Sequence, residues 1–72
     1  MTRIATILFK IANEADDIHG TCSIIRSAAY FVENGAPEDI SFALFLLEHS
    51  KRVTDETEFI DKAIKIITEK SI

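Results

Sequence analysis

Asp16, His19 and Cys22 are the residues of this sequence whose types and spacing come closest to those of a chemical site. They lie three positions apart, so a helix would place them on neighbouring parts of its surface. Carboxylate, imidazole and thiolate groups bind metals, and di-metal helical bundles use carboxylates three residues from histidines. Those sites need several more carboxylates facing the core, and Cys22 falls in an apolar pattern. We therefore expect no metal site and interpret Cys22 as a small buried hydrophobic residue.

Covalent catalysis and phosphate binding have no better candidates. A nucleophilic enzyme needs a serine or cysteine beside a histidine and an orienting acid in a pocket. Four serines fall on expected helices without such a grouping: Ser23, Ser27, Ser41 and Ser50. The only glycines are Gly20 and Gly35, so there is no glycine-rich loop to hold a phosphate. We expect a protein that is not an enzyme and that uses no cofactor.

The charge distribution argues against a nucleic-acid binder. The formal net charge is −4, from 12 acidic and 8 basic residues, and the signs are mixed along the chain. A nucleic-acid binder usually carries a concentrated basic face. The basic clusters are Lys51-Arg52 and the group Lys62, Lys65 and Lys70, and acidic residues interrupt the second. We interpret both as solvated helix faces.

The size of the chain favours self-association. Its 72 residues make one helical domain, over residues 1–72. A core of this size is marginal, and small domains often add disulfides, metals or oligomerisation. A single cysteine cannot form an internal disulfide, so oligomerisation remains. No stretch approaches the ~18 apolar residues of a membrane span. We also find no signal peptide, and we expect a cytoplasmic protein that does not enter a membrane.

The N-terminal part of the chain carries a heptad pattern of apolar residues. Apolar residues alternate at spacings of four and three at Ile4, Leu8, Ile11, Ala15, Ile18, Cys22, Ile25, Ala29 and Val32. This pattern predicts one long helix over residues 3–33. Gly20 is its weak point, because glycine costs up to ~1 kcal/mol against alanine inside a helix. A break at His19-Gly20-Thr21 is the alternative.

Two shorter helices are expected to follow. Asn34-Gly35 predicts a left-handed C-terminal cap, and Pro37 fits a first helical position, with acidic residues after it. These signals predict a helix over residues 37–53 after a short turn. Thr54 or Asp55 is a plausible N-cap for a third helix over residues 55–70, which is apolar on one face only. The third helix either continues the direction of the second or turns back to form a compact three-helix bundle.

The 37–53 helix is the most informative element, because it is apolar on two opposite faces. A rotation of about 100° per residue separates the two groups by roughly half a turn. One face holds Ile40, Ala43, Leu44 and Leu47, and the other holds Phe42, Phe45, Leu46, His49 and Val53. A helix buries one stripe against one neighbour, so the second stripe needs another copy of the chain or another protein. We expect His49 at the edge of a core, with its polar tip hydrogen-bonded or in water, although a pH-sensitive interface residue is an alternative.

Surplus apolar residues also lie on the back of the second half of the 3–33 helix, at Ile24, Ala28 and Phe31. Together with the second stripe, they place the excess hydrophobic surface between residues 24 and 53. Two copies packing there would form a four-helix core, and we expect a homodimer. The alternative is a monomer in which the 55–70 helix covers the second stripe.

The fold is therefore expected to be all-α: a long N-terminal helix and two shorter ones, in a helical hairpin or three-helix unit that dimerises into a bundle. We expect a small regulatory protein-binding module, an adaptor, anti-activator or inhibitor, that masks the surface of an unidentified partner protein with apolar helix faces. The expected contact residues are Ile24, Phe31, Phe42, Phe45, Leu46, His49 and Val53. Two alternatives remain. One is a nucleic-acid-binding helical protein, either a helix-turn-helix or an RNA-binding bundle, and the other is a structural subunit of a larger assembly.

Overall fold

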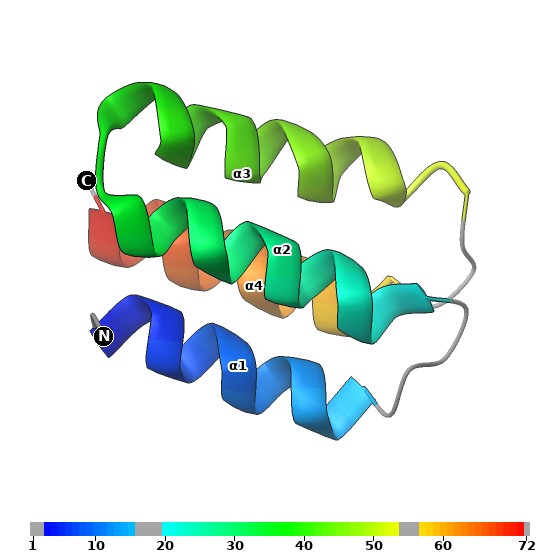
Figure 1. The fold of residues 1–72 in the computed structure, drawn as a ribbon. Coiled ribbons are helices and arrows are strands. Elements are labelled where there is room, and N and C mark those ends of the chain that lie inside the picture. The colour runs from blue at the N-terminus through cyan, green and yellow to red at the C-terminus, as the bar shows by residue number, and fades with distance from the viewer. Residues whose placement is uncertain (1–2, 16–19, 54–56, 72) are drawn as a thin grey trace.

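The computed structural model describes residues 3–15, 20–53 and 57–71, and this part of the chain folds into helices joined by short turns. The helices are α1 (Arg3–Ala15), α2 (Thr21–Asn34), α3 (Pro37–Ser50) and α4 (Glu58–Ser71). Successive helices run in opposite directions and lie side by side (Figure 1). α4 also packs against α1, so the four helices close around a common core. The expectation of an all-α protein is confirmed for the described residues.

The prediction of one continuous helix over residues 3–33 is wrong. α1 ends at Ala15 and α2 begins at Thr21, and the two lie antiparallel against each other. Gly20, directly before α2, has φ 76° and ψ 6°, a left-handed conformation that an α-helix cannot contain. The described residues therefore form four helices where three were expected. Ile18 and the candidate ligands Asp16 and His19 lie outside the described residues.

The α2–α3 turn is built by the residues that predict it. Gly35 caps α2 with φ 78°, and its N–H donates to the carbonyl of Val32 at 3.0 Å. Ala36 is extended, with φ −70° and ψ 142°, as a residue before proline usually is. Pro37 opens α3, and Glu38 and Asp39 occupy its first turn, where negative charge favours the helix dipole.

The chain turns back after α3, so that α4 neither continues α3 nor completes a three-helix bundle. The α-helix ends at Ser50, and residues 51–53 continue as a tighter turn. In this turn the N–H groups of Arg52 and Val53 donate to the carbonyls of His49 and Ser50, both at 3.1 Å. The candidate caps Thr54 and Asp55 lie outside the described residues. Lys51 Nζ then bonds to Asp61 Oδ1 at 2.7 Å, which ties the end of α3 to the first turn of α4.

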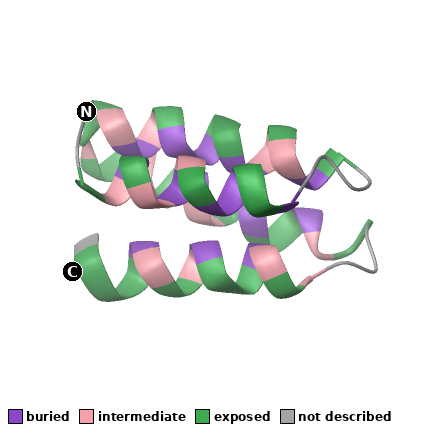
Figure 2. Cartoon of the chain, turned by 90° about the horizontal axis from the view of Figure 1, so that it is seen from below, coloured by how far each residue is buried: buried purple, intermediate pink, exposed green. Residues whose placement is uncertain are grey.

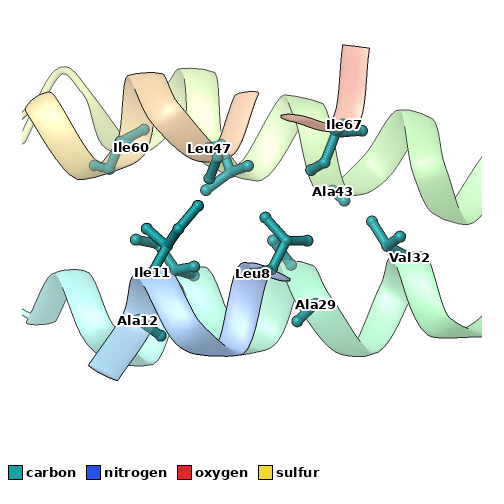
Figure 3. Packing of buried hydrophobic residues seen from close by; sticks show 12 residues of the cluster. Leu8, Ile11, Ala12, Ala29, Val32, Ala43, Leu47, Ile60 and Ile67 are labelled. Atoms are coloured by element: carbon teal, nitrogen blue, oxygen red, sulfur yellow. The ribbon is translucent and has the colours of Figure 1, made fainter. Parts of the chain in front are cut away.

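Each helix contributes one apolar stripe to the core, and its exposed residues lie on the outside (Figure 2). The large side chains that are fully buried include Leu8, Ile25, Leu47, Ile60 and Ile67. Small residues lie among them, such as Ala12, Ala29 and Ala43 (Figure 3), and let neighbouring helices approach closely. The heptad residues of the sequence are thus largely buried, although they come from two helices. Among the described helices, none combines the length and the apolar character that crossing a membrane requires.

Candidate protein-interaction surface

The two apolar faces of α3 have different environments. Ala43 and Leu47 are fully buried, and Ile40 and Leu44 pack half-buried against the core. On the opposite side, Phe42 is 45% exposed and Phe45 is 62% exposed. Two further residues predicted for this side, His49 and Val53, are exposed, and Leu46 is half-buried. The bundle therefore uses one stripe of α3 for its own core and leaves the other on the surface.

The aromatic side chains on this side of α3 and the neighbouring Phe31 contact one another in a continuous line. Phe31 of α2 meets Phe42 edge-on at 4.8 Å between ring centroids, and Phe42 stacks on Phe45 at 6.2 Å. Phe45 in turn stacks on the His49 imidazole at 5.7 Å. We call Phe31, Phe42, Phe45 and His49 the aromatic strip. Because each ring packs against the next, the strip is already ordered, and less conformational entropy is lost when a partner covers it.

Three exposed residues of α3 and its C-terminal turn, spaced seven apart, define a line along this surface. Ala43 and Leu47, the core residues, lie two positions on either side of Phe45, about 160° around the helix from it. Phe45 therefore points directly away from the core. Glu38 precedes Phe45 by seven residues, and heptad spacing returns to nearly the same side, with a drift of ~20°. Arg52 follows Phe45 by seven residues and lines a shallow pocket of about 310 Å³ together with Phe45, Glu48 and His49. We call Glu38, Phe45 and Arg52 the outer line of α3.

The two basic residues at the end of α3, Lys51 and Arg52, differ in their ion pairs. The hydrogen bond from Lys51 to Asp61 raises the pKa of Lys51 above its ordinary value of 10.5, against a smaller opposing effect of desolvation. Lys51 is thus engaged in joining α3 to α4. Arg52 and Glu38 are both exposed, and neither makes an ion pair within the described part of the chain. The outer line consequently has a free acid at one end, an apolar centre and a free base at the other end.

Ile24 and its neighbours occupy a different environment from the one that the sequence predicts. Ala28 is fully buried, and Ile24 is half-buried against the core. The reason is the break before Gly20: α2 lies between α1 and α3 and packs against both. The residues on the back of the predicted 3–33 helix are therefore largely core, and the prediction that they form surplus surface is wrong for Ala28. Phe31 lies at the margin: it is half-buried, and it forms the end of the aromatic strip through its contact with Phe42.

A second aromatic contact lies on the other side of α2. Tyr30 is 65% exposed, and its ring meets Phe9 of α1 edge-on at 5.3 Å. Phe9 falls outside the heptad pattern, and Tyr30 belongs to the next helix. The sequence alone therefore gives no sign of this pair, which depends on how α1 packs against α2. Nearby, Arg26 Nη2 donates to Asn13 Oδ1 at 2.7 Å. This contact helps to hold α1 against α2.

The described residues show no arrangement for metal binding. Within them, no group of three or more histidine, cysteine or acidic residues is arranged to hold a metal ion. Cys22 is a free thiol and is half-buried, where the sequence predicted a buried residue. The aromatic strip and the outer line of α3 are thus the features of this structure that point to an interaction.

Comparison with known proteins gives no relative: no family model, no curated protein and no solved structure matches the chain.

Proposed function

We propose that this chain is a small regulatory protein-binding module, an adaptor, anti-activator or inhibitor without enzymatic activity, that acts as a homodimer. It would mask a surface of its partner protein with its apolar helix faces. The observation that carries this proposal is the aromatic strip, with Phe42 and Phe45 45% and 62% exposed on a bundle whose core is otherwise closed.

The strip has the properties of an interface. Contiguous apolar patches on small proteins commonly mark contact sites, and aromatic side chains dominate binding energies when a partner excludes water from them. Leu46 and Val53 extend the apolar area beside the rings. Tyr30 lies on the other side of α2, against Phe9, and is not part of this area. We therefore place partner binding on the α2–α3 side of the bundle.

The charges of α4 favour protein binding over nucleic-acid binding. Lys65 lies 4.0 Å from Glu69, and Lys62 lies over the Phe59 ring at 5.4 Å. Acidic residues thus accompany the lysines on this helix, whereas a nucleic-acid face concentrates positive charge. α3 and α4 also lie antiparallel and side by side (Figure 1), whereas the two helices of a helix-turn-helix cross at about 90–120°.

Comparative binding experiments test this function. Purified protein is immobilised and exposed to a lysate of its native host, and retained proteins are quantified by mass spectrometry. We expect Phe31→Ala and Leu46→Ala to lose the same retained protein that Lys62→Ala and Lys65→Ala keep, with retention resistant to nuclease and to high salt. The oligomeric state of each variant is measured first, because the strip is also part of the surface expected to self-associate.

The opposite order of effects would contradict the proposal. If the lysine variants lose binding, and if retention depends on nucleic acid and falls steeply with salt, the chain is a nucleic-acid binder. If none of the four variants changes retention, the strip is not the binding surface.

A further inference from the structure

We propose that the outer line of α3 is covered by the same line of a second copy, running antiparallel across a two-fold axis at Phe45. Glu38 of each copy then lies opposite Arg52 of the other, and the two Phe45 rings meet at the axis. This arrangement deepens the proposed function, on whose premise it rests: that the aromatic strip is a contact surface.

The spacing along α3 fits a two-fold axis. An isologous interface must be self-complementary, so a residue on the axis meets itself and residues equally far on either side meet each other. Phe45 lies midway in the sequence between Glu38 and Arg52. Glu38 is about 10 Å away along α3, which rises about 1.5 Å per residue, and Arg52 lies in the turn directly after the other end of α3. An apolar ring at the centre and opposite charges at the two ends are what such an axis requires.

Charge complementarity selects the antiparallel direction. A parallel pair would place Glu38 beside Glu38, and Arg52 beside Arg52, of the two copies. An antiparallel pair forms two Glu38–Arg52 contacts. Both side chains are exposed and make no ion pair among the described residues, so neither must leave an existing partner. Lys51 is held by Asp61 at 2.7 Å, which leaves Arg52 as the base at this end.

The available area indicates a dimer of moderate affinity. The molecule measures 29 × 21 × 17 Å along its principal axes. A face along the helices therefore offers on the order of 500–600 Å² per copy, below the ~800 Å² of a standard interface. Central aromatic anchors contribute more to affinity than area does. We expect association in the micromolar range.

Charge reversal tests the pairing directly. Sedimentation equilibrium is measured on the purified full chain as wild type, Glu38→Arg, Arg52→Glu and the double variant. Each single change creates two like-charged contacts, and we expect it to weaken the dimer about ten-fold or more. The double variant restores both opposite-charge contacts and should dimerise like the wild type. An equimolar mixture of the two single variants should form a heterodimer.

Glu14→Arg and Lys10→Glu are matched controls. They make the same changes of charge on α1, on the opposite side of the bundle from α3 (Figure 1). Both controls should dimerise like the wild type. Circular dichroism of every variant checks that the helices are retained.

Cross-linking gives a second readout that does not depend on charge. In a Cys22→Ser background, Phe45→Cys should form an intermolecular disulfide in mild oxidant. A mixture of Glu38→Cys and Arg52→Cys should cross-link between the two variants, whereas each alone should not. Self-cross-linking of either end variant would show a parallel pair and overturn the arrangement.

The other outcomes also decide the question. A wild type that sediments only as the 8.1 kDa species, or a double variant as weak as the single ones, overturns the inference. Because this assay contains only the purified chain, it can fail while the partner assay still shows strip-dependent binding to another protein. Conversely, a restored double-variant dimer without any strip-dependent partner would leave the pairing intact and contradict the partner-binding function.

Discussion

The His49 imidazole lies nearly parallel to the Phe45 ring, 5.7 Å away and tilted by 15°. The two side chains are one helical turn apart, and neither has a core residue above it. The imidazole and the phenyl ring are therefore stacked on each other while both remain exposed to solvent. The imidazole thus packs against Phe45, the residue of α3 that points directly away from the buried Ala43 and Leu47. This relationship makes the exposed face of α3 an ordered surface.

A change at Phe45 should weaken dimerisation without destabilising the folded monomer. Phe45→Glu places a charge at the centre of the exposed face without touching the core, so we expect the dimer to be lost. The intrinsic stability of the monomer should change within about 0.5 kcal/mol, as for other surface substitutions. Light scattering gives the oligomeric state, and urea unfolding at a dilution where the wild type is monomeric gives the stability. A Phe45→Glu protein that stays dimeric would mean that another surface carries the contact.

The two leucines of α3 should respond differently to truncation. Leu47 is fully buried, and Leu47→Ala should destabilise the fold by ~2–5 kcal/mol because it removes contacts and leaves a cavity. Leu44 is half-buried, so Leu44→Ala should be distinctly milder. Urea unfolding gives the free energy of unfolding of the two variants, which differ only in the position of the same Leu→Ala change. Equal losses would show that Leu44 is as deeply packed as Leu47.

Gly20→Ala tests the break in the predicted 3–33 helix. A Cβ at Gly20 would meet no atom within 4 Å, but the backbone there has φ +76°. The cost is therefore conformational, about 1–2 kcal/mol for a residue with a Cβ in the left-handed region. Gly20→Asn should be milder, because asparagine visits this region more readily. Thermal melting of both variants gives the order. A higher melting temperature for Gly20→Ala would instead support the continuous helix over residues 3–33, because alanine is more stable than glycine inside a helix.

The Lys51–Asp61 contact predicts a pH dependence at the alkaline end. The pKa of Lys51 is raised in the folded protein above its ordinary value of 10.5, so the folded state binds the proton more tightly than the unfolded state. The stabilisation is then fully present below this ordinary value and is lost as the pH rises through the raised one. Because the pair is partly exposed to solvent, the effect is small.

Asp61→Asn provides the comparison for this effect. The stability difference between wild type and variant, measured by urea unfolding, should be constant below about pH 10 and should shrink as the pH rises above the ordinary lysine pKa of 10.5. A difference that is also constant above this pKa would show that the contact does not contribute in solution.

Much of the buried set follows from periodicity alone. Leu8, Ile25 and Val32 lie in the heptad pattern and are buried. The separation of α3 into a core face with Leu47 and an outer face with Phe45 also follows from about 100° per residue. The short turn at Gly35 and Pro37 follows from local backbone preferences. These properties depend on residues close together in the chain, and the sequence by itself determines them.

Only the tertiary structure shows that the chain reverses between α1 and α2, within the heptad pattern of residues 4–32. A heptad pattern continues unchanged through the break before Gly20, because two helices packed face to face bury the same residues that one long helix would present to a partner. The choice depends on whether α1 finds its partner within the chain, which is a long-range energy that no local pattern contains. That choice also buried Ala28 between α2 and its neighbours and brought Phe9 to Tyr30, while the outer face of α3 remained exposed.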